Sequence, residues 1–206
     1  MIKNYPEIIP IFPLGGVIYF PKTNLPLNIF EQRYLDLVND IYNKDKLMGM
    51  IQPQKNNNSF FKVGCLGKIT DFQKSKDGRI MINLTGITRF EILNEVKNNK
   101  LYKEFKVDYK KFNKDFSSSS YNEEMSSFMI KAKNFFKKNG LLLNWKEFDN
   151  LDNGQKINTL AMIAPITNEE KQKLLEAITL KDKIDTLENI ISFYLLGAGF
   201  ENQTVQ

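Results

Sequence analysis

The chain has 206 residues, of which 29 are Lys or Arg and 24 are Asp or Glu, so its formal net charge at pH 7 is +5. It contains no histidine and one cysteine, which excludes Ser-His-Asp and Cys-His catalysis, zinc sites with histidine ligands and an intrachain disulfide. The small basic excess is spread over a mixed sequence and gives only weak support for nucleic-acid binding.

The sequence contains no run of about 18 apolar residues, so we expect no transmembrane helix. Pro10 and Pro13 interrupt the first apolar run, so we expect no secretory signal peptide. The single cysteine, Cys65, lies in an alternating apolar run and is predicted to be a small buried hydrophobe rather than a nucleophile. Together these features favour a cytoplasmic protein.

Residues 10–34 combine four prolines with a glycine pair and many apolar side chains. Because proline fixes φ at about −65° and lacks a backbone donor, no helix can run through this stretch. We expect short strands instead, at residues 7–12, 17–20 and 25–27. The apolar residues that follow recur at the helical period, which predicts an amphipathic helix over residues 30–42 with Asn28 as its N-cap.

A polar loop at residues 53–59 separates two further groups of predicted strands. The strands are expected at residues 47–52, 61–72, 79–86, 87–97 and 101–112. Gly64 and Gly67 indicate a bulge or a tight bend, and Asp77-Gly78 predicts a type I′ hairpin turn. Several short strands joined by tight turns, with one helix among them, are typical of a small, mostly antiparallel β-barrel.

After a polar linker at residues 113–120, the predicted elements change from strands to helices. Helices are predicted over residues 121–138, 153–164, 167–177 and 179–196. Thr167 and Glu170 have the spacing of a capping box at the start of the third helix. We therefore expect three regions, a β-barrel domain at 1–115, a helical domain at 116–200 and a disordered tail at 201–206.

Three stretches of the first half resemble the opening of the Lon N-terminal domain family, the substrate-binding domain of Lon proteases. They are Pro10–Leu14, Phe20-Pro21 and Leu25–Tyr34. Val63-Gly64, Asp77-Gly78-Arg79 and Gly86-x-x-Arg89-Phe90 follow in the order and approximate spacing of that family. The resemblance covers residues 8 to about 112 well and the helical half more loosely. Asn28 and Gln32 depart from it, since the family usually has histidine and often proline at these two positions.

The resemblance implies an α+β fold, with a PUA-like, mostly antiparallel β-barrel that contains one inserted helix and is followed by a C-terminal α-helical bundle. It also implies a role in holding unfolded or degron-bearing protein segments. The P-loop pattern is absent, and 206 residues leave no room for the ATPase and peptidase of a full Lon protease. We therefore expect a stand-alone, non-enzymatic binding module without catalytic residues, cofactor, metal or membrane contact, which works with a protease or a chaperone.

Four apolar residues are candidates for the peptide-binding surface, because methionine and exposed aromatic side chains suit promiscuous grooves. They are Met48, Met50, Phe60 and Phe61, for which ordinary core packing is the alternative. Glu31, Arg33 and Arg89 are interpreted as structural polar residues, with Glu31 and Arg33 paired with Arg79, Arg89 or backbone groups across the sheet. The alternative for Glu31 and Arg33 is a grip on a peptide terminus.

A cluster of lysines surrounds the last predicted strand, at positions 97, 100, 103, 106, 110, 111 and 114. A solvated edge that discourages pairing between sheets is the favoured interpretation. RNA binding by a PUA-like protein is the alternative, and its affinity would fall steeply with salt. An enzyme that uses carboxylates or lysines is the least favoured hypothesis, since no spaced constellation of such groups stands out.

Overall fold

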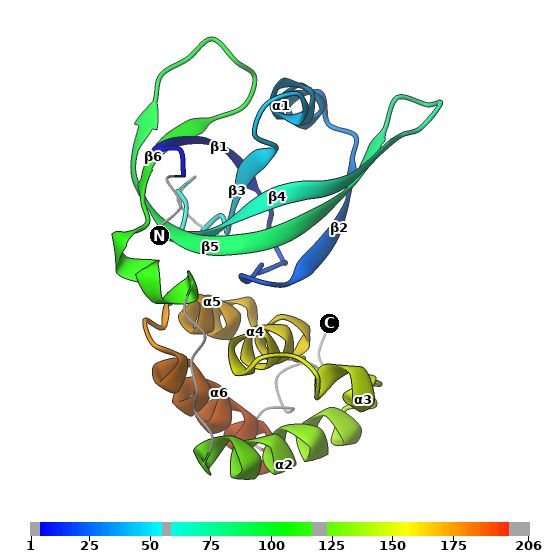
Figure 1. Cartoon of the computed structure of the whole chain (residues 1–206), viewed down its shortest axis with the longest axis vertical. Helices are drawn as coiled ribbons and strands as arrows, with labels where there is room; N and C mark the ends of the chain where they lie inside the picture. The colour runs from blue at the N-terminus through cyan, green and yellow to red at the C-terminus, as the bar shows by residue number, and fades with distance from the viewer. Residues whose placement is uncertain (1–4, 55–58, 117–122, 198–206) are drawn as a thin grey trace. The chain divides into compact units, whose positions relative to one another are not determined.

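The computed structural model describes residues 5–54, 59–116 and 123–197 (Figure 1). The chain divides into two compact units, Met1–Ser117 and Ser118–Gln206, and each is described by itself. No helix within the described ranges is long and apolar enough to cross a membrane. The predicted tail at residues 201–206 lies outside those ranges.

The first unit is built on a six-stranded sheet with the order β2-β5-β4-β3-β1-β6. The strands are β1 (Ile8–Pro13), β2 (Asn24–Ile29), β3 (Leu47–Ile51), β4 (Val63–Lys74), β5 (Ile80–Val96) and β6 (Glu104–Asp108). Because β5 also pairs with β6, the pairs β1–β3, β3–β4, β4–β5, β5–β6 and β6–β1 form a closed circuit. Within this circuit of described strands, β1–β3 is parallel and the other four pairs are antiparallel. The remaining strand, β2, adds to the first half of β5.

Strand β5 replaces the two strands predicted at 79–86 and 87–97. Its 17 residues pair with β2 and β4 at one end and with β4 and β6 at the other, so one bent strand serves both parts of the sheet. The bulge predicted at Gly67 is confirmed by a register shift between Leu66 and Gly67. Glycine is required at position 86, because a Cβ there would lie 2.2 Å from the backbone oxygen of Phe20.

The predicted strand at residues 17–20 is wrong. Tyr19 and Phe20 are buried but belong to no strand, because the chain turns here over β5. Lys22 N donates to Gly86 O and Gly86 N donates to Thr23 O, each at 2.9 Å. The apolar run thus signalled burial and not sheet pairing. The strand predicted at 101–112 is also shorter, since only Glu104–Asp108 pairs and a 3₁₀ helix, η1 (Lys110–Phe116), follows.

Helix α1 spans Gln32–Tyr42 and buries Tyr34, Leu37, Val38 and Ile41. Its N-cap is Glu31 rather than Asn28, because Asn28 pairs with Met81 in the sheet. The turn after β4 also differs from the predicted type I′ form. Only Gly78 has a positive φ, of 89°, whereas a type I′ turn needs positive φ at both central residues.

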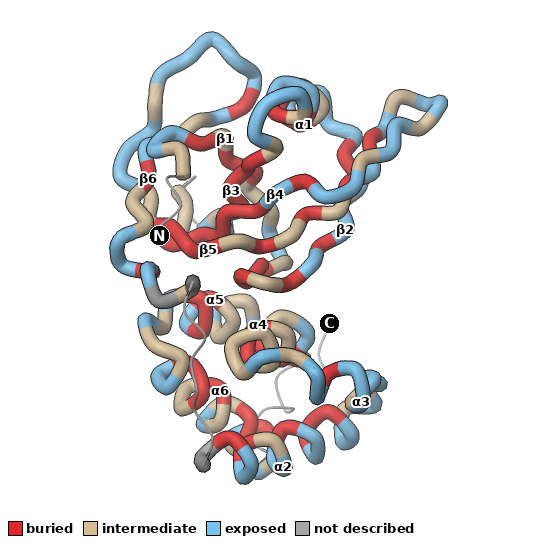
Figure 2. The backbone as a smooth tube through the Cα atoms, viewed as in Figure 1, coloured by how far each residue is buried: buried red, intermediate tan, exposed pale blue. Residues whose placement is uncertain are grey.

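Buried apolar side chains from five strands pack into one cluster, which explains why the circuit is stable. Figure 2 shows the buried residues concentrated along β3, β4 and β5. The cluster consists of Ile9, Ile11, Leu47, Ile51, Leu66, Phe90, Phe105 and Val107. Cys65 is also fully buried, as predicted.

The second unit is helical. Its helices are α2 (Glu123–Lys138), α3 (Trp145–Phe148), α4 (Asn153–Ile163), α5 (Asn168–Glu176) and α6 (Leu180–Leu195). Helix α6 contacts α2, α4 and α5. The capping box of Thr167 and Glu170 is confirmed, and Thr179 with Asp182 forms another at the start of α6.

Candidate functional site

A hollow of about 480 Å³ lies on the first unit, beside the start of α1. We call it the Phe60 groove. Its apolar wall comes from separate parts of the chain, Ile11 and Pro13 of β1, Tyr34 of α1, Phe60, Leu101 and Tyr102. Leu101 is 65% exposed, so the groove presents an apolar side chain to solvent.

The aromatic rings of the groove are held by packing behind them. Phe60 meets Phe105 edge-on with 5.8 Å between ring centroids, and Tyr34 packs on Phe12 at 4.3 Å. Phe60 also forms a backbone bridge with Pro53. The rings are therefore fixed in place before any ligand arrives, which lowers the entropy lost on binding.

Charged groups on the rim of the groove have partners of their own. Arg33 pairs with Glu31 at 2.7 Å and lies 4.5 Å from the Tyr34 ring centroid. Lys103 pairs with Glu95 at 2.9 Å. Because these charges are already paired, the groove combines apolar side chains with neutralised charges and the polar side chains of Gln54 and Ser59, rather than forming a charged site.

The hydroxyl of Tyr102 is tied back to α1. It donates to Asp40 Oδ2 at 2.7 Å, and the side chain is almost fully buried. Burial and this hydrogen bond to a carboxylate raise the pKa of Tyr102 to about 12, because both oppose formation of a phenolate. Tyr102 is therefore a neutral, fixed part of the wall.

Of the four predicted peptide-binding residues, Phe60 alone lines the groove. Met48 and Met50 are 0% and 3% exposed in the interior of β3, where no ligand can reach them without a rearrangement. Phe60 lines the groove, and Phe61 is half-buried outside its lining. The prediction missed Leu101 because that residue had been assigned to a strand, and its exposure depends on the turn before β6.

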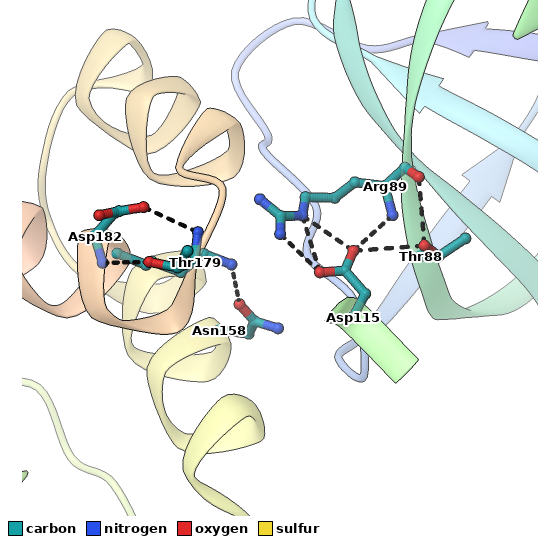
Figure 3. Close-up of polar contacts among 7 residues, drawn as sticks. Thr88, Arg89, Asp115, Asn158, Thr179 and Asp182 are labelled. Carbon is teal, nitrogen blue, oxygen red and sulfur yellow. Dashed lines mark hydrogen bonds and ion pairs between the residues drawn. The ribbon is translucent and has the colours of Figure 1, made fainter. Parts of the chain in front are cut away.

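The three predicted structural residues have partners that the sequence did not indicate. Glu31 and Arg33 pair with each other, and Arg79 pairs with Asp77 at 2.9 Å. Arg89 is 2% exposed and binds Asp115, with 2.7 Å between Nη2 and Oδ1 (Figure 3). The guanidinium also lies 4.4 Å from the ring centroid of Phe112. This buried pair fixes η1 against β5.

Four of the lysines around β6 are paired with acidic residues. The pairs are Lys100–Glu104, Lys103–Glu95, Lys106–Glu7 and Lys111–Glu91. With these four neutralised, the lysines do not form a bare basic patch, although Lys97 and Lys110 have no ion pair among the described residues, and the pattern supports the solvated edge over RNA binding. The side chain of Lys114 lies outside the described part of the structure. Within the described residues, no three His, Cys, Asp or Glu side chains gather in a group that could hold a metal ion.

Solved structures with related folds are Lon domains. The chain is similar to the "Lon N-terminal domain protein from Xanthomonas campestris", with a TM-score of 0.67 at 21% identity, covering 90% of this chain and 98% of that one. The N-terminal domain of the Mycobacterium avium complex Lon protease gives 0.63 at 14% identity, with the same coverage. At these identities the likeness shows a shared fold, mixed α+β with a six-stranded sheet and several helices.

Sequence relatives are Lon proteases. Those of Syntrophus aciditrophicus and Malacoplasma penetrans are 24% and 29% identical, over 98% and 92% of this chain. The chain spans 28% and 26% of their lengths. The family model of the ATP-dependent protease La (LON) substrate-binding domain matches residues 8–192. The chain therefore belongs to the LON substrate-binding domain family.

Proposed function

We propose that the first unit binds unfolded or extended protein segments and does no chemistry itself. The observation that carries this proposal is the Phe60 groove, whose lining combines packed aromatic rings with the solvent-exposed Leu101. Membership of a family of protease substrate-binding domains supports it, because the substrates of a protease are proteins. Degron-bearing segments, as the resemblance implies, are ligands of this kind.

The groove has a volume of about 480 Å³, which limits the number of side chains that it can bury and so the affinity that it can supply. Burying a Leu or Phe side chain contributes about 2–3 kcal/mol, whereas a dissociation constant of 1 µM requires about 8 kcal/mol. We therefore expect weak binding of single segments. Tighter binding needs a ligand with several apolar side chains or several copies of the groove on one assembly.

The finer features of the fold are part of the same proposal. The closed circuit of strand pairs supports a PUA-like β-barrel at residues 1–115, and the helices support a bundle domain at 116–200. We place the chain in the cytoplasm, as a non-enzymatic module that presents segments to a protease or a chaperone. Met48, Met50 and Phe61 remain candidates for contact only if β3 and its surroundings open on binding.

Binding of a fluorescein-labelled, permanently unfolded polypeptide rich in Leu and Phe tests the proposal. Saturable fluorescence anisotropy is expected for the intact chain, and Leu101→Ser should weaken binding roughly fivefold. Leu93→Ser is the matched control, because Leu93 is 55% exposed in the same unit and lies outside the groove lining. Absence of saturable binding to a varied panel of such polypeptides would contradict the proposal. An equal loss of affinity in Leu101→Ser and Leu93→Ser would contradict it as well.

A further inference from the structure

A second hollow, of about 720 Å³, lies on the first unit where the chain leaves α1 and enters β3. We call it the lysine groove. Its floor is aliphatic and comes from Leu47, Ile69 and Ile87, of which the half-buried Ile87 is the most open to contact, because Leu47 and Ile69 are 8% and 3% exposed. Three lysines line it, Lys44, Lys46 and Lys68.

The backbone fixes where two of these lysines stand. The amides of Lys44 and Lys46 both donate to Ile41 O, at 2.9 and 3.1 Å, and Ile69 N donates to Lys46 O at 2.9 Å. Lys46 has a φ of 62°, a left-handed conformation that glycine or asparagine adopts at lower cost. A charged residue therefore occupies a position where the local geometry favours a different residue type, a pattern associated with functional sites.

The lysines of this groove lack the neutralisation seen around β6. In the described residues no ion pair joins Lys44, Lys46 or Lys68 to a carboxylate, whereas Lys106 and Lys111 pair with Glu7 and Glu91. The one carboxylate that lines the groove, Asp45, accepts a hydrogen bond from Leu47 N at 3.1 Å. The excess of positive charge also belongs to this unit, which has 19 Lys and Arg against 12 Asp and Glu, compared with 10 against 12 in the second unit.

We infer that the lysine groove binds acidic protein segments, with an apolar side chain on the aliphatic floor and flanking carboxylates beside the lysines. This inference rests on the proposed function, that the first unit binds protein segments, and adds a preference for negative charge. Charge complementarity of this kind contributes specificity and faster association more than raw affinity.

A protein ligand fits the groove better than a nucleic acid does. Single-stranded nucleic acids gain much of their binding energy by stacking bases on open aromatic faces. Tyr42 and Phe72 do not line the groove and stack on each other, with 4.1 Å between centroids, and Lys46 Nζ lies 4.5 Å from the Tyr42 ring centroid. Tyr5 packs against Tyr109 at 5.8 Å. Tyr5, which is half-buried, is the one aromatic residue of the described lining, and the rest of the apolar lining is aliphatic, which suits an apolar side chain.

Two labelled peptides of equal length test the inference, one with a Leu-Phe centre flanked by Glu and one with the same centre flanked by Gln. The intact chain should bind the Glu peptide about fivefold more tightly at low salt, and the preference should shrink as salt rises. The double variant Lys44→Gln, Lys68→Gln should lose the preference and keep its affinity for the Gln peptide. The matched control is Lys106→Gln, Lys111→Gln, which removes the same charge from the same unit at paired lysines and should keep the preference.

Equal affinity of the intact chain for the two peptides would overturn the inference while leaving the proposed function in place. Equal effects of the two double variants would overturn it as well, because they would show a response to net charge alone. Failure of both peptides to bind would remove the proposed function and this inference together. A 12-nucleotide RNA that binds more tightly than the Glu peptide, and loses affinity with Lys44→Gln, Lys68→Gln, would assign the groove to nucleic acid instead.

Discussion

One carboxylate, that of Asp115, accepts hydrogen bonds from three N–H groups of Arg89. Nη2 donates at 2.7 Å, and Nε and the backbone amide each donate at 3.0 Å (Figure 3). Arg89 lies in the middle of β5 and Asp115 lies near the end of η1. Both side chains are buried, at 2% and 8% exposure, so the pair holds the last segment of the first unit against its longest strand.

Removal of Asp115 should be costly, because it leaves an uncompensated charge in the interior. Asp115→Ala is expected to lower the free energy of unfolding by about 3–5 kcal/mol, measured by urea denaturation. Asp77→Ala is the control, since it breaks a pair with Arg79 whose side chains are about half exposed, and it should cost less than about 1 kcal/mol. Similar losses of unfolding free energy in the two variants would show that the buried pair stabilises the fold no more than the exposed pair does.

Gly86 should not tolerate a side chain. In Gly86→Ala the new Cβ would meet the backbone oxygen of Phe20, which cannot rotate away, so we expect at least about 2 kcal/mol of destabilisation. Gly15→Ala is the control, because its Cβ would lie 3.7 Å from Pro53, an ordinary contact. Thermal unfolding of both variants measures the difference, and an unchanged midpoint for Gly86→Ala would contradict the close approach of residue 20 to β5.

The buried hydroxyl of Tyr19 has no hydrogen-bond partner among the described residues. Burial raises the pKa of this phenol above its ordinary value, because a phenolate could not be solvated there. Tyr19→Phe removes an unsatisfied polar atom and should leave stability at neutral pH unchanged or raise it by up to about 1 kcal/mol. A loss larger than about 1 kcal/mol in urea denaturation would mean that the hydroxyl has a partner in solution.

Stability should fall in alkali as Tyr102 ionises. Its pKa is about 12 in the folded chain against 10.0 for an ordinary tyrosine, so the folded state holds the proton more tightly. The resulting stabilisation is present below about pH 10 and is lost as the pH rises through 12, amounting to roughly 2–3 kcal/mol. Urea denaturation between pH 9 and 12 should show a shallower decline for Tyr102→Phe than for the original chain. Parallel declines of stability in the two proteins would contradict a raised pKa of Tyr102.

The N-cap of α6 should stabilise the second unit. Thr179 accepts a hydrogen bond from Asp182 N at 3.1 Å, and Asp182 accepts one from Thr179 N at the same distance. Thr179→Ala should cost about 1 kcal/mol, whereas Thr179→Ser keeps the hydroxyl and should cost little. Hydrogen exchange is the measurement, with faster exchange expected in α6 for the alanine variant only. Unchanged exchange in both variants would mean that packing alone sets the helix start.

Local signals in the sequence predicted much of the secondary structure. The spacing of Thr167 and Glu170 located the start of α5, and the apolar stripe that contains Leu37 and Ile41 located α1. These predictions succeed because helix periodicity and capping depend on residues only three or four positions apart. The family resemblance, taken from the proline-rich opening, supplied the rest of the α+β assignment.

Features that depend on distant parts of the chain could not be predicted. Residues 17–20 look like a strand, but the turn of the chain over Gly86 leaves them unpaired with any strand. Met48 and Met50 look like a binding surface, but β3 is covered on both sides. The Phe60 groove joins residues 11 to 103, and nothing in its local sequences indicates that they meet.

Backbone amide NMR of the intact ¹⁵N-labelled chain, titrated with the unfolded polypeptide, tests most directly whether the first unit captures protein segments at the Phe60 groove. We expect saturable shift changes that are largest at the amides of Ser59, Phe60, Leu101 and Tyr102 and that disappear in Leu101→Ser. Changes confined to the second unit, or no saturable change at any amide, would contradict the account.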